Sequence, residues 1–357
     1  MYLGGIIIKK RVVLGMSGGV DSSVAAVLLQ KEGYEVVAVF MRNWADDGIC
    51  TAADDYMDVA KVCSQLNIKY FTVNFEKEYR DRVFSYFLSE YKKGRTPNPD
   101  VMCNTEIKFK AFLEYALNFD CDYIAMGHYA RTKKIDSRTY LLKGKDNNKD
   151  QSYFLSRVKE EALAKTLFPV GDLEKSEVRK IAEEYNLSTA LKKDSTGICF
   201  IGERDFNEFL DKFLLTKPGN IVDEHGKVLG KHTGLIHYTI GQRRGMGIGG
   251  VGSGEPFFVA GKDLEKNELI VAQGEKNPIL YKKIFEVEDI FWINDPPKLP
   301  REFCVKIRYR TKDEPCHLIY ENDKYIVNLK NPLKGVTPGQ VAVFYSEDIC
   351  LGSGIIK

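Results

Sequence analysis

The sequence lacks two features that would set it apart from ordinary folded proteins. It has no long apolar run, because Lys9, Lys10 and Arg11 interrupt the early apolar stretch at residues 6–14, which excludes a secretory signal and a membrane-spanning helix there. It also has no excess of either charge, since 52 basic and 50 acidic residues give a net charge of +2. A polyanionic partner must then be held by local basic patches. We expect a cytoplasmic protein with no membrane partner.

Paired cysteines are also missing. Eight cysteines are present, but no two of them form a C-x-x-C pair. Without an export signal, neither a structural disulfide framework nor a zinc site is expected, and we assign no metal ligand. Individual cysteines therefore become candidates for chemistry.

The chain has 357 residues, 44% of them hydrophobic and 29% charged, which is too long for one ordinary core and predicts two or three domains. In the first half, short runs rich in Val, Ile and aromatic residues alternate with helical patterns. The predicted strands are residues 11–16, 35–41, 70–75 and 122–126, and the predicted helices are residues 20–30, 54–66, 78–92, 106–117 and 175–185. This alternation predicts an α/β fold with a doubly wound parallel sheet.

After about residue 206, Gly and Pro become frequent and short alternating segments replace the helical ones. This pattern predicts two small β-rich, barrel-like domains. The expected domains are residues 1–206, a catalytic α/β domain; residues 207–277, a β-rich linker; and residues 278–357, a barrel.

The segment GMSGGVDSS at residues 15–23 follows the first predicted strand and opens the first predicted helix. Its glycines allow a tight turn that brings N–H groups close to an anion, and Ser17 and Ser22 add hydroxyl donors at the positive end of the helix. It lacks the lysine of the G-x-x-x-x-G-K-[ST] loop. The segment predicts a phosphate-binding loop; the alternative is a plain turn in which Asp21 or Ser22 caps the helix.

Two cysteines lie in unusual surroundings. Cys103 lies in TPNPDVMCN at residues 96–104, which we interpret as a proline-stiffened loop leading into a helix whose dipole favours a thiolate. Asp100 lies three residues before it and is a candidate proton donor or acceptor. Cys199 lies in DSTGICF beside a glycine. We expect both cysteines in accessible turns; the alternative is that each is a small buried hydrophobe.

Residues 303–312 alternate with a period of two, which places Lys306, Arg308, Arg310 and Lys312 on one face of a strand. Same-face residues are about 6.6 Å apart, comparable with the spacing of phosphates along RNA. The pattern predicts a basic ladder along an RNA backbone; the alternative is an edge strand whose basic side is simply solvated.

From residue 6 to the end, the chain resembles the bacterial tRNA-specific 2-thiouridylases, members of the N-type ATP pyrophosphatase superfamily. The motifs that carry the resemblance are GMSGGVDSSV at 15–24, FMRNW at 40–44, GRTPNPDVMCNTEIKF at 94–109, GHYA at 127–130, KDQSYFL at 149–155, LFPVGDLEK at 167–175, DSTGICFIGERDF at 194–206, TIGQRRGMGIGG at 239–250 and VTPGQVAVFY at 336–345. The resemblance implies an adenine nucleotide alpha hydrolase-like fold for the first domain. It also implies ATP-dependent conversion of the wobble uridine of tRNA to 2-thiouridine.

The resemblance also implies roles for single residues. It places Cys103 as the nucleophile and Cys199 as the carrier of a persulfide. The implied ATP-binding residues are Gly15, Met16, Ser17, Gly18, Gly19, Val20, Asp21, Ser22, Met41 and Gly127. The implied contacts with the target base come from Asn98, Pro99 and Asp100, and those with the rest of the tRNA from Lys149, Asp150, Gln151, Arg308 and Tyr309.

The chemistry of the residues agrees with this assignment. Adenylation of the C2 oxygen of uridine by ATP with Mg²⁺ creates a leaving group, and the terminal sulfur of a persulfide on Cys199 then attacks C2. Cys103 releases sulfide or resolves the mixed disulfide. Two cysteines that exchange sulfur must approach each other, so a Cys103–Cys199 disulfide is a further hypothesis. The expected partners are tRNA and a persulfide carrier protein or cysteine desulfurase.

Two other functions stay open at this point. One is another adenylating synthetase or amidotransferase with the same loop, which would not need the two cysteine motifs. The other is a non-catalytic sulfur carrier or RNA-binding protein, against which the intact SGGVDSS segment argues.

Overall fold

The computed structural model describes residues 2–3, 6–7, 9–44, 51–194, 205–249 and 253–357. Contacts between residues divide the chain into two compact units. The first unit comprises Met1–Phe84, Asp100–Gly202 and Asp348–Leu351, and the second comprises Ser85–Pro99, Glu203–Glu347 and Gly352–Lys357. Residues 85–99 of the predicted catalytic domain thus pack with the second unit. The bounds of the three predicted domains stay a prediction.

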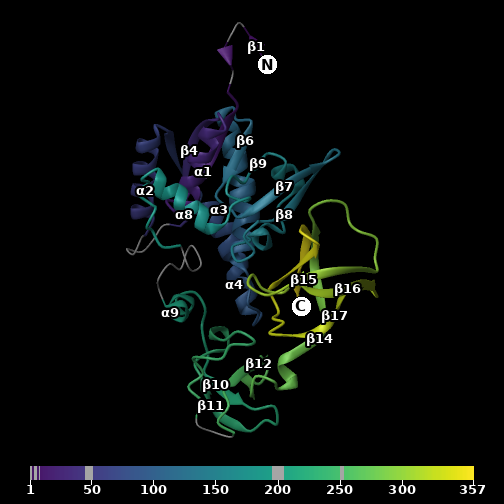
Figure 1. Ribbon diagram of the computed structural model, residues 1–357. Helices are drawn as coiled ribbons and strands as arrows, with labels where there is room; N and C mark the ends of the chain where they lie inside the picture. The colour runs from purple at the N-terminus through teal and green to yellow at the C-terminus, as the bar shows by residue number, and fades with distance from the viewer. Residues whose placement is uncertain (1, 4–5, 8, 45–50, 195–204, 250–252) are drawn as a thin grey trace. The chain divides into compact units, whose positions relative to one another are not determined.

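The first unit is built on a parallel sheet of five strands. Their order is β5 (Lys69–Asn74), β4 (Glu35–Arg42), β3 (Arg11–Met16), β6 (Tyr123–Met126) and β9 (Thr166–Leu167). Four of these strands were predicted from the sequence, and the parallel α/β fold is confirmed. Figure 1 labels β4, β6 and β9 of this sheet, together with the helices α1, α2 and α8.

Both faces of the central strand are buried. Val12 and Leu14 of β3 belong to a core cluster on one face, while Val13 points to the other face and is also 0% exposed. The helices that contribute to the first cluster are α1 (Val20–Lys31), α2 (Thr51–Leu66) and α8 (Lys175–Glu184). Burial on both faces explains why β3 and β4 are apolar almost throughout and do not alternate, whereas β5 at the edge of the sheet is largely exposed.

Two further helical stretches connect β5 to β6. The first consists of α3 (Glu76–Tyr79), a π-helical turn at Arg80–Phe84 and α4 (Ser85–Lys92). The second consists of α5 (Pro99–Cys103), a π-helical segment at Asn104–Ala111, α6 (Phe112–Ala116) and a 3₁₀ turn at Leu117–Phe119. The second stretch begins at Pro99, several residues before the predicted start at 106.

The sequence did not predict the hairpin of β7 (Ala130–Ile135) and β8 (Arg138–Lys143), which follows β6. Ile349 and Cys350, close to the end of the chain, pair with Leu142 and Leu141 of β8. After the hairpin come a 3₁₀ turn at Ser152–Leu155 and α7 (Glu160–Leu163). Because the paired residues are far apart in the sequence, the local sequence pattern does not predict this pairing.

The second unit contains a small sheet and a barrel. After α9 (Phe206–Asp211), the small sheet has the order β11 (Val228–His232), β10 (Gly219–Val222), β13 (Glu268–Gln273) and β12 (Phe257–Asp263). Its core contains Ile221, Val259, Leu269 and Val271. A 3₁₀ turn at Leu235–His237 lies between β11 and β12, and another at Pro278–Leu280 precedes the barrel.

The barrel strands follow each other as β14 (Tyr281–Trp292), β17 (Lys324–Lys334), β16 (Glu314–Glu321), β15 (Arg301–Lys306), β18 (Val341–Ser346) and β19 (Ile349–Ile356). An additional pairing of β14 with β19 closes the ring, which removes free edges. Trp292 packs inside with Phe303 and Phe344. The two β-rich folds predicted from the sequence are confirmed. Over the described part of the chain, no helix combines the length and the apolar character needed to cross a membrane.

Candidate functional site

The glycine- and serine-rich segment lies where the strand order of the parallel sheet reverses. From β3 the chain moves outward through β4 and β5 and then returns to β6 on the other side of β3. In open α/β sheets, ligands bind at the carboxyl ends of the strands at such a point. Residues 15–22 end β3 and begin α1, while Met41 and Gly127 lie at the same ends of β4 and β6. The predicted ATP residues therefore share one edge of the sheet.

Hydroxyl groups organise the turn between β3 and α1. Ser17 N donates to Ser22 Oγ over 3.3 Å, and Ser22 Oγ donates to Gly19 O over 3.1 Å. Ser23 Oγ donates to the same carbonyl oxygen over 2.9 Å. Gly19 is the N-cap of α1 and provides no side-chain cap, so N–H groups of the first turn are left for another acceptor. This is the local structure that binds a phosphate group.

Two glycines around this turn have no room for a side chain. A Cβ at Gly127 would lie 2.8 Å from Ser22 N. Gly18 has a φ of +74°, and a Cβ there would lie 2.5 Å from Asp55 O. The tight approach of the backbones around the segment fits a loop that wraps an anion.

A network of charges extends from α1 to Asp194. Tyr129 Oη donates to Asp21 Oδ1 over 2.7 Å, and Lys175 Nζ contacts the same oxygen at 2.6 Å and Asp194 Oδ1 at 2.9 Å. Lys149 Nζ lies 2.8 Å from Asp194 Oδ2. Burial raises the pKa of Asp194, but hydrogen bonds from Lys149 and Lys175 outweigh burial and lower it to about 2. Sequence reasoning missed Lys175, although its position at the end of the LFPVGDLEK motif was a signal.

We expect Lys175→Met to destabilise the protein at neutral pH, because it leaves Asp21 and Asp194 without their shared cation. A depressed pKa stabilises the fold above the usual Asp pKa of about 4, and this stabilisation is lost as the pH falls toward about 2. The loss should therefore be on the order of 1 kcal/mol near pH 7, since Asp194 is partly solvated and keeps its contacts with Lys149 and Arg179, and it should shrink as the pH is lowered. Urea unfolding at several pH values measures it. Lys175→Arg is the control that keeps the charge; an equal loss at every pH would contradict the prediction.

The predicted tRNA residues next to Lys149 have internal partners. Asp150 Oδ1 accepts hydrogen bonds from Gly144 N and Ser152 N, each over 3.0 Å, and Asp150 is only 3% exposed. Gln151 Oε1 accepts a hydrogen bond from Tyr129 N over 2.9 Å. These two side chains hold the loop in place. Their contact with tRNA stays a prediction, and the burial of Asp150 argues against it.

Cys103 does not lie in the accessible loop that the sequence predicted. It ends α5 inside a continuous helical stretch and is 2% exposed. The physical reason is Pro99, whose fixed φ and missing N–H suit the first turn of a helix as well as a loop. Asp100 and Cys103 are three residues apart in this helix and therefore lie on the same face. The helix thus brings together two of the predicted reactive residues.

A lysine of the same helical stretch influences the site. Burial raises the pKa of Asp100, and the positive charge of Lys108 opposes that rise. Burial also lowers the pKa of His128 well below its ordinary value, and Lys108 lowers it further. A neutral imidazole therefore follows Gly127. Lys108 thus influences the pKa of Asp100 in the helix and of His128 after β6. Sequence reasoning missed this role, although Lys108 lies in the TEIKF motif.

Two buried polar atoms lie close to these groups in the sequence. Asn104 Oδ1 and His128 Nδ1 are buried and have no hydrogen-bond partner among the residues that the structure describes. Asn104 Nδ2 donates to Asp100 O over 2.9 Å, which fixes its amide beside α5. Unsatisfied buried polar atoms are costly and are therefore typical of sites that receive a ligand. Asn104 and His128 join the candidate site.

Because burial raises the pKa of Asp100, its ionised form is disfavoured in the folded protein. A raised pKa stabilises the fold at low pH, and this stabilisation is lost as the pH rises through the folded pKa. We expect Asp100→Asn to be as stable as the wild type or more stable at pH 7, with a difference that disappears below about pH 4. Melting temperatures across this pH range test it. Lower stability of the variant at pH 7 would show that the carboxylate is stabilised instead.

The loop before Asn98 is held by hydrogen bonds within the second unit. Gln340 Nε2 donates to Thr96 O over 2.8 Å and to Pro97 O over 3.2 Å. Thr96 N donates to Pro338 O over 2.9 Å. The motif VTPGQ near the end of the chain therefore supports the segment that leads to Asn98 and Pro99.

The predicted basic ladder does not form. β15 ends at Lys306, so Arg308 and Tyr309 lie in the turn that follows. Lys306 is 9% exposed, forms an ion pair with Asp313 and lies over the ring of Tyr345. The ladder prediction was wrong because alternation in sequence does not show that basic side chains have internal partners.

Arg308 also has partners inside the second unit. Its Nη2 donates to Ile240 O over 2.6 Å and to Thr337 Oγ1 over 2.9 Å. These bonds give Arg308 a structural role near the Gly-rich segment at 239–250. Contacts of Arg308 and Tyr309 with tRNA stay a prediction.

Cys199 lies outside the described residues, so its predicted role as persulfide carrier stays a prediction.

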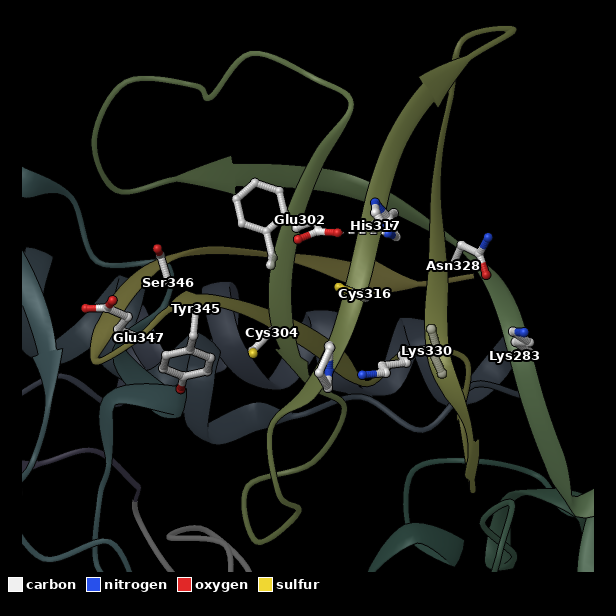
Figure 2. Close-up of a pocket in the computed structure, with 13 residues that line it drawn as sticks. Lys283, Glu302, Cys304, Cys316, His317, Asn328, Lys330, Tyr345, Ser346 and Glu347 are labelled. Atoms are coloured by element: carbon white, nitrogen blue, oxygen red, sulfur yellow. Dashed lines mark ion pairs between the residues drawn. The ribbon is translucent and has the colours of Figure 1, made fainter.

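A cavity of about 690 Å³ lies on the barrel (Figure 2) and is lined by residues of both charges, including Lys283, Lys330, Glu302 and Glu347. None of the predicted site residues that the structure describes lines it. Burial raises the pKa of its Cys316 to about 12, so this thiol is a poor nucleophile. Among the described residues, the barrel cavity therefore shares none with the candidate site.

Three family models match successive parts of the chain. They are the tRNA methyl transferase HUP domain over residues 10–203, the tRNA methyl transferase PRC-barrel domain over residues 207–273 and the aminomethyltransferase beta-barrel domain over residues 282–356. A tRNA-specific 2-thiouridylase of Geobacillus kaustophilus (strain HTA426) is 59% identical over 354 residues, which are 98% of this chain and 95% of the relative. The chain belongs to the tRNA-specific 2-thiouridylase family.

A second tRNA-specific 2-thiouridylase, from Ligilactobacillus salivarius (strain UCC118), is 56% identical over 355 residues and covers 97% of this chain and 95% of its own length. The descriptions of the family models mention methyl transfer, but the 2-thiouridylases match nearly the whole chain, and the assignment follows them.

Among solved structures, a U34-tRNA thiolase from Methanococcus maripaludis with its [4Fe-4S] cluster is 20% identical, with a TM-score of 0.37 over 54% of this chain and 62% of its own. That likeness is too low to add to the assignment. The members of the 2-thiouridylase family are sulfurtransferases that use ATP, and the turn before α1 fits the phosphates.

Proposed function

We propose that the protein converts the wobble uridine of tRNA to 2-thiouridine by adenylating the C2 oxygen and transferring sulfur from a persulfide on Cys199. The observation that carries this proposal is the glycine- and serine-rich turn at the carboxyl edge of the parallel sheet, with N–H groups of α1 left for a phosphate. Full-length similarity to 2-thiouridylases supports the choice of acceptor.

The proposed ATP site comprises the residues of the turn, Gly15, Met16, Ser17, Gly18, Gly19, Val20, Asp21 and Ser22, together with Met41 and Gly127. The C2 oxygen forms a bond with the α-phosphorus, and pyrophosphate leaves. The first-turn N–H groups and Lys175 offset the negative charge of the phosphates. Mg²⁺ accompanies ATP and neutralises part of that charge. Among the described residues no group of three or more His, Cys, Asp or Glu side chains gathers, so we assign Mg²⁺ no protein ligand.

The proposed sulfur step takes place between Cys199 and Cys103. The terminal persulfide sulfur attacks C2, and AMP leaves with the former uridine oxygen. Cys103 thiolate then attacks the Cys199 sulfur of the mixed disulfide, which releases the thiolated base and leaves a Cys103–Cys199 disulfide. A thiol reductant must supply two electrons to restore both thiols. Alternatively, Cys103 first releases sulfide from the persulfide, and the sulfide attacks C2.

The remaining roles are part of the same proposal. Asn98, Pro99 and Asp100 contact the target base, and Asp100, whose pKa burial raises, exchanges a proton with it. The persulfide comes from a persulfide carrier protein or cysteine desulfurase. The need for thiol reductants and a tRNA substrate places the reaction in the cytoplasm.

The test is to incubate the protein with unmodified tRNA, ATP, Mg²⁺ and a sulfide or persulfide donor and then digest the RNA. The expected result is 2-thiouridine, detected by mass, with one pyrophosphate released per thiolated base. Pyrophosphate release without 2-thiouridine would indicate another adenylating enzyme, and no ATP consumption would indicate a binding protein. Either outcome would overturn the proposal.

A further inference from the structure

A small basic pocket lies within the second unit, beside the loop that leads to Asn98. Its volume is about 200 Å³, which suits a single phosphate-sized group. Gly94, Arg95 and Thr96 line it from the loop, and Lys262 lines it from β12. The pocket shares no lining residue with the barrel cavity.

Lys262 differs from the other cations of this pocket. Lys93 and Arg95 both pair with Glu90, and Arg95 also pairs with Glu288. Lys262 Nζ donates to Gly94 O over 3.2 Å, and no carboxylate of the described residues pairs with it. Burial lowers the pKa of this ammonium to about 8. A desolvated cation without a counter-charge is costly in the free protein and favours a site that receives an anion.

The position of the pocket indicates which anion it receives. The pocket wall at residues 94–96 continues directly into Asn98 and Pro99, the residues proposed to contact the target base. Gln340 and Pro338 hold this loop, so the pocket wall and the base-contacting residues form one supported segment. Thr96 of the pocket wall is two residues from Asn98, at most about 7 Å along an extended chain, and each RNA base is flanked by two backbone phosphates. A base held at Asn98 therefore brings a phosphate into reach of the pocket.

We propose that Lys262 binds a backbone phosphate of the tRNA beside the target uridine. This inference rests on the proposed function for the identity of the RNA. The phosphate replaces the missing counter-charge of Lys262, and the bound backbone fixes the position of the base at Asn98. Lys262 is thus a positioning residue for the RNA.

The test compares Lys262→Met with Lys262→Arg, and uses Lys266→Met as the matched control, since Lys266 is an exposed lysine in the turn after β12. We expect Lys262→Met to weaken tRNA binding about tenfold, as loss of a charged hydrogen bond does. The slope of log affinity against log salt should become shallower by about 0.7–0.9, the change for one phosphate contact. Lys262→Arg and Lys266→Met should leave affinity and slope near those of the wild type.

Two further measurements separate this role from others. The KM for ATP should be unchanged in Lys262→Met, and its melting temperature should equal or exceed that of the wild type, because a desolvated charge is removed. A lower melting temperature together with unchanged salt slope would make Lys262 a structural residue and overturn the proposal. Titration with inorganic phosphate that binds the wild type but not Lys262→Met, with an unchanged tRNA slope, would show a free-anion site and also overturn it.

Failure of the proposed function gives a different result. If the wild type binds tRNA but makes no 2-thiouridine, the reaction assignment is wrong. The salt slope of Lys262→Met still reports on the phosphate contact in that case. The two proposals therefore fail independently.

Discussion

Replacing Cys103 by serine is expected to reduce thiolation of tRNA by a factor on the order of 10³ or more, because a hydroxyl is a poor nucleophile toward sulfur. Release of pyrophosphate in the first turnover should persist, since adenylation uses the turn before α1. With a Cys199 persulfide already loaded, the variant should accumulate tRNA joined to the protein by a disulfide. Gel analysis without reductant and nucleoside mass analysis measure the two effects.

Cys121→Ser is the matched control, because Cys121 is a half-buried cysteine of the same unit whose Sγ donates to a backbone carbonyl, a bond that serine retains. It should thiolate tRNA at the wild-type rate. Cys199→Ser should lose transfer from a persulfide donor while it still binds ATP. Normal thiolation by either Cys103→Ser or Cys199→Ser would remove that cysteine from the mechanism.

Gly127→Ala is expected to weaken ATP binding by one to two orders of magnitude. A Cβ at this position would lie 2.8 Å from Ser22 N and 3.0 Å from Ser22 Cα, both backbone atoms that cannot move without shifting the start of α1. Overpacking of this kind costs about 1–3 kcal/mol, and the shift moves the N–H groups that receive the phosphate. Titration of the variant with a non-hydrolysable ATP analogue measures the loss, and tRNA affinity measured separately should change little.

Gly261→Ala is the matched control for added volume, because a Cβ there would make only an ordinary contact of 3.6 Å with Ile270. It should bind ATP as the wild type does. If Gly127→Ala also binds ATP normally and melts normally, the packing between Gly127 and α1 is not what positions the phosphate site.

The strands and helices around the nucleotide turn were predictable because they depend on local patterns. Apolar runs of β-branched residues indicate strands buried on both faces, and glycines with hydroxyls at a strand-to-helix junction indicate an anion site. The environment of Cys103 was not predictable in the same way. Pro99 suits a loop or a first helical turn, and only packing of the helix decides between them.

Side-chain partners far away in sequence also could not be predicted. Lys306 and Arg308 have the same charge pattern as a solvated basic face, yet Asp313 and Thr337 engage them inside the second unit. Lys262 shows the reverse, since nothing in the sequence around it indicates that no carboxylate of the described residues pairs with its ammonium group. Such differences depend on which segments meet in three dimensions.

By itself, the sequence determined the parallel α/β fold, the β-rich second half, the glycine- and serine-rich turn between strand and helix, and the family, because each rests on residue order and local periodicity. Only the tertiary structure decided that Asp21, Lys175 and Asp194 form one network, that Cys103 is buried and that Lys262 lines a pocket together with Gly94, Arg95 and Thr96. The physical reason is that burial and charge pairing depend on distances between segments, which local patterns do not contain.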